Sequence, residues 1–309
     1  MEVAFVAPEE DPRLWLPGLR AALPSFSFHL WPEIPDPAAV EALLVAKPPA
    51  GALAGFPNLR LIQSLWMGVD GLLADPSLPR GVPLARLVDP GMLAAMSETV
   101  LARVLDWHRD LYRYRAQQRE RLWRPLPQRL AADRTVGLLG LGELGRQAAQ
   151  RLLQLGFRVC GWSRRPKEVD GVECLSGARG LDALLAQSGA LVCLLPLTDV
   201  TRGILNARLF ARMAEEACLI NVGRGAHLVE ADLLAALDAG RLAHAYLDVF
   251  ETEPLPPEHP FWAHPAVSLT PHVAALTEPR TALPGVIRNL ERAKRGEPPE
   301  GRVDPLAGY

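Results

Sequence analysis

This 309-residue sequence contains few cysteines and no long apolar segment. Its four cysteines form no CxxC pair and have no histidine at a metal-ligand spacing, so we expect neither a disulfide framework nor a metal site. Cys160, Cys193 and Cys218 lie inside apolar runs, which predicts small buried thiols in a reducing compartment. The longest apolar run, 190–197, is much shorter than the ~18 residues of a membrane-spanning helix, so we expect no membrane insertion.

The sequence also lacks an excess of charge of either sign. Lys and Arg number 33 against 35 Asp and Glu, and the net charge of −2 argues against a nucleic-acid or membrane-surface partner. Charged residues make up 22% and hydrophobic residues 49%, which predicts a sizeable core rather than disorder. The opening segment MEVAFVAPEE has no basic stretch and no cleavable signal pattern, so we expect a cytoplasmic location.

Short apolar runs alternate with helical patterns along most of the chain. Runs that are apolar on both faces are typical of parallel strands covered by helices, so the sequence predicts the α/β class with doubly wound parallel sheets. The predicted strands are 3–6, 43–46, 59–63, 84–88, 135–139, 158–161, 190–195, 217–221, 243–248 and 267–270. The predicted helices are 97–123, 144–155, 230–239 and 280–294. A break at 125–132, and a number of strands too large for one compact sheet, favour two domains.

A glycine-rich turn links one of these strands to the helix that follows. It reads Gly140-Leu-Gly142-Glu143-Leu144-Gly145, which is GxGxxG in the strand–turn–helix setting that the motif requires. The first glycine allows the tight turn, the second lets the backbone approach a pyrophosphate, and the third lets the helix pack close to the strand. The free N–H groups at the start of the helix suit phosphate oxygens. The turn therefore predicts dinucleotide binding.

The next strand ends in Ser163-Arg164-Arg165. An NAD-selecting site normally has an acidic residue here, which accepts a hydrogen bond from the ribose 2′-OH. A hydroxyl and two guanidinium groups suit a 2′-phosphate instead, through charge-assisted and often bidentate hydrogen bonds. The sequence therefore favours NADP(H), with NAD(H) as a second cofactor that the site could accept. A pair of solvated surface arginines is the alternative.

Three polar residues follow the carboxyl ends of predicted strands in the second half of the chain. Arg224, Glu253 and His272 stand in the segments NVGRG, LDVFETEPL and TPHVA. In an open α/β sheet the ligand crevice lies outside these strand ends, so the three side chains can converge. Together they indicate an anionic substrate and proton transfer, against the alternatives of a structural ion pair, an exposed turn and an ordinary histidine. We interpret the other histidines as structural or exposed; they are His29, His108, His227, His244, His259 and His264.

Taken together, the motifs resemble the D-isomer-specific 2-hydroxyacid dehydrogenase family, and most of all its glyoxylate/hydroxypyruvate reductase branch. The matching segments are LGLGELG, CGWSRRPK, LLPLT, NVGRGAHLVEADLLAALD, LDVFETEPLPP, TPHVAALT and the ending VDPLAGY. The resemblance covers essentially the whole chain. It implies an NADP-preferring oxidoreductase that reduces a small 2-keto acid, such as glyoxylate or hydroxypyruvate, to the D-2-hydroxy acid.

The resemblance also implies a role for each candidate residue. Arg224 would hold the substrate carboxylate and polarise the keto oxygen, and His272 would donate a proton to that oxygen as the hydride arrives. Glu253 would hydrogen-bond the other imidazole nitrogen and fix its orientation, and Asp248 would contact the nicotinamide carboxamide. The further implied cofactor contacts are Leu195, Pro196, Val222 and Gly223. The implied substrate contacts are the N–H groups of Met67 and Gly68 and the side chain of Trp262.

For the domains, the resemblance implies a nucleotide domain inserted into a substrate domain. The substrate domain would consist of residues 1–97 and 279–309, and the NADP-binding domain of residues 98–278. Members of the family are usually dimers through the nucleotide domain, so a homodimer is expected.

One segment departs from the pattern of the reductase branch. Trp66 and Met67 stand where these relatives usually carry small residues. The pair could narrow the substrate pocket or enlarge an apolar wall, so a bulkier 2-keto acid is the alternative substrate. A dinucleotide-sensing binding protein, as in the corepressor branch of the family, is the alternative from another class, and the sequence shows no added interaction segment that would favour it.

Overall fold

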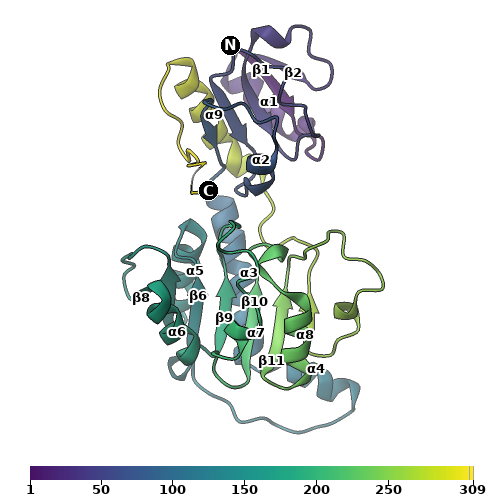
Figure 1. The fold of residues 1–309 in the computed structure, drawn as a ribbon, viewed down its shortest axis with the longest axis vertical. Helices are drawn as coiled ribbons and strands as arrows, with labels where there is room; N and C mark the ends of the chain where they lie inside the picture. The colour runs from purple at the N-terminus through teal and green to yellow at the C-terminus, as the bar shows by residue number, and fades with distance from the viewer. Residues whose placement is uncertain (306, 309) are drawn as a thin grey trace. The chain divides into compact units, whose positions relative to one another are not determined.

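A computed structural model describes residues 1–305, 307 and 308, so Leu306 and Tyr309 of the ending VDPLAGY lie outside the described residues. The chain forms two compact units, which we call the terminal unit (residues 1–92 and 276–309) and the central unit (residues 93–275). Figure 1 shows the two units. Their boundaries lie a few residues before those implied by the family resemblance, and the first falls in the opening turn of α3 (Pro90–His108).

The terminal unit contains a five-stranded parallel sheet with the strand order β2-β1-β3-β4-β5 among its described residues. Its strands are β1 (Glu2–Val6), β2 (Ser27–Leu30), β3 (Val40–Val45), β4 (Leu61–Ser64) and β5 (Leu84–Ala85). Its helices are α1 (Pro12–Ala22), α2 (Asp70–Ala74) and α9 (Pro279–Lys294). This is the flavodoxin-like order, in which loops on either side of β1 and β3 leave the carboxyl edge in opposite directions.

The C-terminal helix α9 packs onto the terminal unit far from its own place in the sequence. It lies against α1, where a Cβ on Gly18 would approach Leu283 Cδ1 to 2.7 Å. It also contacts β4, where Asn289 Nδ2 donates a buried hydrogen bond of 2.6 Å to Gln63 Oε1. These contacts explain why the last helix belongs with the first strands.

The central unit contains a seven-stranded parallel sheet with the order β12-β11-β10-β9-β6-β7-β8 among its described residues. Its strands are β6 (Thr135–Leu139), β7 (Arg158–Ser163), β8 (Glu173–Ser176), β9 (Ala190–Cys193), β10 (Ala217–Asn221), β11 (Leu242–Leu247) and β12 (Val267–Leu269). Its further helices are α4 (Leu111–Arg119), α5 (Glu143–Gln154), α6 (Gly177–Gln187), α7 (Ala207–Phe210) and α8 (Glu230–Asp238). The order reverses between β6 and β9, so the ligand crevice of a Rossmann-type sheet is expected at their carboxyl ends.

Both faces of the central sheet are covered by helices. Side chains of Leu191 and Cys193 point to the core under α6, α7 and α8, whereas their neighbours Ala190 and Val192 point to the core under α3 and α5. This period-two alternation of buried residues is what a doubly wound sheet requires. In Figure 1, α7 and α8 lie in front of this sheet and α3 lies behind it. The predicted α/β class with two Rossmann-like sheets is confirmed.

Two strands, β2 and β8, were not predicted from the sequence, and both are edge strands. Each has residues of mixed exposure rather than a continuous apolar run, because an edge strand is covered less than a central one. The prediction of one helix over 97–123 is wrong. The chain instead forms α3 and α4, separated by Asp110 in the left-handed conformation (φ 56°).

The described part of the chain contains no helix that is both long and apolar enough to cross a membrane. Within the same residues, no three His, Cys, Asp or Glu side chains converge as a metal site would need. All four cysteines are free thiols, and the predicted burial of Cys160, Cys193 and Cys218 is confirmed.

Candidate active site

The glycine-rich turn lies at the carboxyl end of β6 and leads into α5. A Cβ on Gly145 would approach the carbonyl oxygen of Gly140 to 1.9 Å, so only glycine allows the first turn of α5 to lie this close to the turn. A Cβ on Gly142 would meet no heavy atom within 4 Å, which leaves room for a ligand beside the backbone. Glu143, Leu144 and Gly145 open the helix, where N–H groups lack carbonyl partners in the preceding turn. These features fit the pyrophosphate of a dinucleotide.

Cationic side chains follow β7, next to the glycine-rich turn. Arg164 and Arg165 are exposed, and the Ser163 hydroxyl donates a hydrogen bond of 2.6 Å to the Arg165 carbonyl oxygen, which shapes this short turn. Lys167 was not among the cofactor contacts predicted from the sequence. In the structure its Nζ donates a hydrogen bond of 2.9 Å to the carbonyl oxygen of Leu141, in the glycine-rich turn. The lysine therefore adds a third positive charge beside the phosphate-binding turn, where a 2′-phosphate would carry negative charge.

The loops after β9 and β10 lie side by side, and His227 joins them. The residue is fully buried (0% exposed), its Nδ1 accepts a hydrogen bond from the Arg224 N–H at 3.1 Å, and its Nε2 lies 3.2 Å from the Pro196 carbonyl oxygen. Because Nδ1 accepts, the ring proton is on Nε2 and donates to that carbonyl. Sequence reasoning gave His227 no part in the site; its place three residues after Arg224 was the available signal.

The remaining predicted cofactor contacts lie in the same two loops. Leu195 is buried (8% exposed) and Pro196 is half-buried after β9, while Val222 and Gly223 are buried after β10. The Val222 N–H donates to the Cys193 carbonyl oxygen at 3.4 Å, which continues the pairing of β9 and β10 beyond their last residues. All four residues therefore lie at the carboxyl edge, close to the point where the strand order reverses.

Arg224 is half-buried in the loop that follows β10. Its Nη1 donates to the Gly223 carbonyl oxygen at 2.8 Å, and Asn221 Nδ2 donates to the Arg224 carbonyl oxygen at 3.1 Å. A Cβ on Gly225 would lie 1.8 Å from the Phe250 carbonyl carbon, so this loop packs directly on the backbone that follows β11. The close approach brings the Arg224 loop next to the loop that carries Glu253.

Glu253 and His272 are in direct contact. Glu253 Oε2 lies 2.7 Å from His272 Nδ1, and Glu253 Oε1 accepts a hydrogen bond from the Phe250 N–H at 2.9 Å. The His272 side chain is 49% exposed, and its backbone has a φ of 53°, in the left-handed region. An ionised carboxylate can only accept, so Nδ1 carries the proton that it shares with Glu253. The arrangement directs Nε2 away from Glu253, where it can exchange a proton with a ligand.

Asp248 positions the segment that carries His272. Its buried carboxylate accepts hydrogen bonds from Thr270 Oγ1 (2.7 Å), the Val273 N–H (3.0 Å) and the Ala274 N–H (2.9 Å). The His272 N–H also donates to the Asp248 carbonyl oxygen at 2.8 Å. Asp248 thus holds the backbone on both sides of His272, and any contact with a nicotinamide is in addition to this role.

The predicted substrate contacts fall in different units. Met67 and Gly68 are in the terminal unit, in the loop after β4. Trp262 is in the central unit, 53% exposed, with its Nε1 donating to the Pro256 carbonyl oxygen at 2.8 Å. The structure therefore brings Arg224, Glu253 and His272 to one edge of one sheet.

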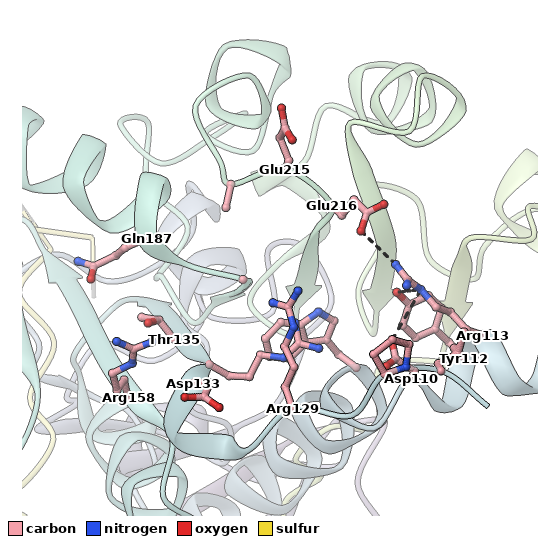
Figure 2. A pocket seen from close by; sticks show the side chains of 16 residues that line it. Asp110, Tyr112, Arg113, Arg129, Asp133, Thr135, Arg158, Gln187, Glu215 and Glu216 are labelled. Carbon is pink, nitrogen blue, oxygen red and sulfur yellow. Dashed lines mark hydrogen bonds and ion pairs between the residues drawn. The ribbon is translucent and has the colours of Figure 1, made fainter.

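A cavity of about 390 Å³ lies at the opposite edge of the central sheet, where Thr135 begins β6 and Arg158 begins β7. It contains four arginines and four carboxylates, of which Arg113 pairs with Glu216 at 3.4 Å and with Asp110 at 3.7 Å (Figure 2). The charges in this cavity balance, and the residues that line it include no histidine. The predicted catalytic residues are therefore not in this cavity but at the carboxyl edge.

Known proteins resemble this chain over its whole length. The family model described as D-isomer specific 2-hydroxyacid dehydrogenase, NAD binding domain, matches residues 101–274. Glyoxylate/hydroxypyruvate reductase A of Yersinia enterocolitica is 42% identical over 314 residues, which cover 100% of both chains. A D-isomer specific 2-hydroxyacid dehydrogenase from Xanthobacter autotrophicus Py2, solved in complex with NADPH and MES, has a TM-score of 0.96 at 43% identity, with 100% of this chain and 99% of that chain covered. An NADPH-dependent glyoxylate/hydroxypyruvate reductase from Sinorhizobium meliloti, solved with NADP and sulfate, has a TM-score of 0.93 at 40% identity over 100% of this chain and 99% of that one.

Proposed function

The chain belongs to the D-isomer specific 2-hydroxyacid dehydrogenase family. We propose that it reduces small 2-keto acids to D-2-hydroxy acids, and that glyoxylate and hydroxypyruvate are its preferred substrates. The observation that carries this proposal is the contact of 2.7 Å between His272 Nδ1 and Glu253 Oε2, next to the loop of Arg224. Relatives with 40–43% identity are named as NADPH-dependent reductases or were solved with NADPH or NADP. The enzyme therefore uses NADP(H) in preference to NAD(H).

In the proposed reaction, each candidate side chain of the central unit has a separate role. Bound NADPH supplies the hydride that reduces the carbonyl carbon. Arg224 binds the substrate carboxylate and polarises the keto oxygen, because a planar guanidinium can bond two oxygens at once. His272 Nε2 donates the proton that converts this oxygen to a hydroxyl, while Glu253 keeps Nδ1–H engaged and the ring in place. Asp248 holds the backbone on both sides of the histidine.

NADP(H) selection rests on the turn after β7. Arg164, Arg165 and Lys167 bind the 2′-phosphate, and the N–H groups at the start of α5 bind the pyrophosphate. An acidic residue that would accept from the ribose 2′-OH of NAD is replaced here by Ser163. NAD(H) binds more weakly because it offers these cations no phosphate.

The two units take different parts in this proposal. The central unit, residues 93–275, binds the cofactor and carries the catalytic residues, and the terminal unit supplies Met67 and Gly68 for the substrate carboxylate.

The four cysteines are free thiols, which favours a cytoplasmic location for the protein.

The active species is a homodimer through the central unit. Trp123 is 98% exposed and Leu130 is 74% exposed, in the segment between α4 and β6. Leu122, next to Trp123, is 48% exposed as well, and exposed apolar side chains that adjoin one another favour a surface that a second subunit covers. If Trp123→Arg leaves the molecular mass in solution unchanged from that of the wild type, this interface is wrong.

The test of the proposed function is a steady-state assay of NADPH and NADH oxidation with glyoxylate, hydroxypyruvate, pyruvate and phenylpyruvate. We expect the highest kcat/KM for NADPH with the two small substrates, and the D-enantiomer as product. Better turnover of phenylpyruvate than of glyoxylate would overturn the small-substrate assignment. No turnover of any keto acid with either cofactor would overturn the function itself.

A further inference from the structure

Glu10 holds two tryptophan side chains in the terminal unit. Its Oε1 accepts a hydrogen bond of 2.7 Å from Trp66 Nε1, and its Oε2 accepts one of 3.0 Å from Trp15 Nε1. Trp15 is fully buried (0% exposed), so one carboxylate oxygen is anchored to the core and the other faces the indole of Trp66. Both oxygens of Glu10 are engaged, which fixes the carboxylate and with it the Trp66 ring.

The backbone of Trp66 is fixed as well. Its N–H donates to Ser64 Oγ at 3.1 Å, and its carbonyl oxygen accepts from Ser64 Oγ at 2.8 Å and from the Leu87 N–H at 3.0 Å. Together with the indole N–H, every polar group of Trp66 has a partner. The residue thus has one backbone position and one ring position, and the ring surface that it leaves to a neighbour consists of carbon atoms alone.

The position of this pair in the sheet connects it to the substrate. Glu10 follows β1 and Trp66 follows β4, at the carboxyl edge where open α/β sheets bind ligands. Trp66 directly precedes Met67 and Gly68, whose N–H groups are assigned to the substrate carboxylate in the proposed function. Directly after β4, Thr277 Oγ1 donates a hydrogen bond of 3.1 Å to the Leu65 carbonyl oxygen, which helps to keep the start of this loop in place.

We propose that Glu10 is a positioning residue, and that the indole it holds at Trp66 selects the keto acid by the size of its side chain. This inference rests on the proposed function. A ring that cannot turn aside excludes bulky side chains from the space next to Met67, and it leaves room for the hydrogen of glyoxylate or the hydroxymethyl group of hydroxypyruvate. We call the Trp66 indole the wall of this space. A mobile indole would move aside for a larger substrate group, so the wall is selective because the Glu10 carboxylate holds it in place.

The first variant removes the wall. Trp66→Ala should raise the ratio of kcat/KM for phenylpyruvate to that for glyoxylate by about tenfold or more, because steric discrimination by an apolar wall is typically worth 10–200-fold. A structural role alone would lower both values together. An unchanged ratio in a folded Trp66→Ala enzyme would overturn the inference.

The second variant releases the wall without removing it. Glu10→Gln leaves one acceptor oxygen for two indole N–H groups, and the buried Trp15 keeps it because an unpaired N–H costs more there than at half-buried Trp66. We expect the ratio of kcat/KM for phenylpyruvate to that for glyoxylate to rise as in Trp66→Ala, but by a smaller factor. The matched control is Glu9→Gln, which removes the neighbouring carboxylate that pairs with Lys47 at 2.6 Å and should leave the ratio unchanged.

The third variant restores the wall. Trp15→Phe in the Glu10→Gln background removes the competing donor, so the amide oxygen becomes available to Trp66 Nε1 and the selectivity should return toward that of the wild type. Near-UV circular dichroism and the Tm report whether each variant is folded. If the wild type is active and Glu10→Gln keeps its selectivity, or the double variant fails to restore it, the inference is wrong. If the wild type reduces no keto acid, the proposed function has failed instead.

Discussion

The Nδ1 atom of His272 lies 2.7 Å from Oε2 of Glu253, and the other oxygen of the same carboxylate accepts the Phe250 N–H at 2.9 Å. The carboxylate therefore has a fixed orientation when it binds the imidazole. Since Nδ1–H is engaged, Nε2 is the ring nitrogen that Glu253 leaves to another partner. A side chain on the loop after β11 thus decides which nitrogen of a histidine after β12 is engaged within the protein.

His272→Ala should lower kcat by roughly 10²- to 10⁴-fold, because the proton donor to the keto oxygen is lost. The Kd for NADPH, measured by fluorescence titration, should stay near the wild-type value. Glu253→Gln should lower kcat less, since the imidazole remains but its orientation is no longer fixed. The control is His264→Ala, which breaks a histidine–carboxylate pair with Asp238 outside the site. If His272→Ala keeps more than about a tenth of the activity, another group donates the proton.

Arg224→Lys should lower kcat/KM for glyoxylate by about 100-fold or more, because a single ammonium cannot bond the carboxylate and the keto oxygen in the geometry of a planar fork. The substitution also removes the hydrogen bond from Nη1 to the Gly223 carbonyl oxygen. Arg208→Lys, at an exposed position on α7, is the control and should behave like the wild type. A lysine enzyme with nearly normal kcat/KM would show that Arg224 does not bind the substrate.

The pair Arg164→Ala and Arg165→Ala should raise the Kd for NADPH by about 100-fold and change the Kd for NADH little, because hydrogen bonds to charged groups contribute about 1.5–3 kcal/mol each. The exposed Arg151 on α5 offers a control, since Arg151→Ala removes a guanidinium away from this turn. Equal losses for the two cofactors would remove the 2′-phosphate assignment.

Two glycines in the same turn should respond differently to alanine. Gly145→Ala places a Cβ 1.9 Å from the Gly140 carbonyl oxygen, so the start of α5 must shift and the Tm should fall. Gly142→Ala meets no heavy atom within 4 Å in the protein, so its Tm should stay near that of the wild type while NADPH binding weakens. Calorimetry with and without NADPH measures both effects. Normal NADPH affinity in Gly142→Ala would place the pyrophosphate elsewhere.

Acid should destabilise the protein through His244, a buried residue in β11 whose Nε2 hydrogen-bonds Ser268 Oγ at 2.9 Å. Burial lowers the pKa of His244 to about 4. An unfolded chain protonates the same side chain near pH 6.5, so the stabilising contribution is present above about pH 6.5 and is lost as the pH falls toward about 4. The loss is at most about 3 kcal/mol.

His244→Gln keeps a polar group near Ser268 and removes the titration, so its free energy of unfolding should change less than that of the wild type between about pH 6.5 and 4.5. Urea unfolding at several pH values measures the difference. His108, whose pKa burial also lowers, contributes equally to both proteins. Parallel pH profiles for the two proteins would contradict this assignment to His244.

Much of the fold was predictable because it is encoded over short distances along the chain. The central strands are apolar on both faces, and this pattern predicted β6, β9 and β10 within two residues of their observed bounds. The glycine-rich turn was predictable for the same reason, since its glycines act on residues within one turn of each other. The edge strands β2 and β8 lack the continuous apolar pattern, because one side of an edge strand is covered less.

The sequence by itself determined the α/β class and the glycine-rich turn at residues 140–145, and it predicted polar candidates at the ends of the central strands. Only the tertiary structure decided which side chains meet: Glu253 with His272, His227 between Pro196 and Arg224, and Glu10 with Trp66, which stand 56 residues apart. Hydrophobic periodicity records which face of an element is buried, but it contains no information on the partner that covers it. Those partners are set by strand order and by the close approach of loops, which the chain acquires only when the sheets assemble.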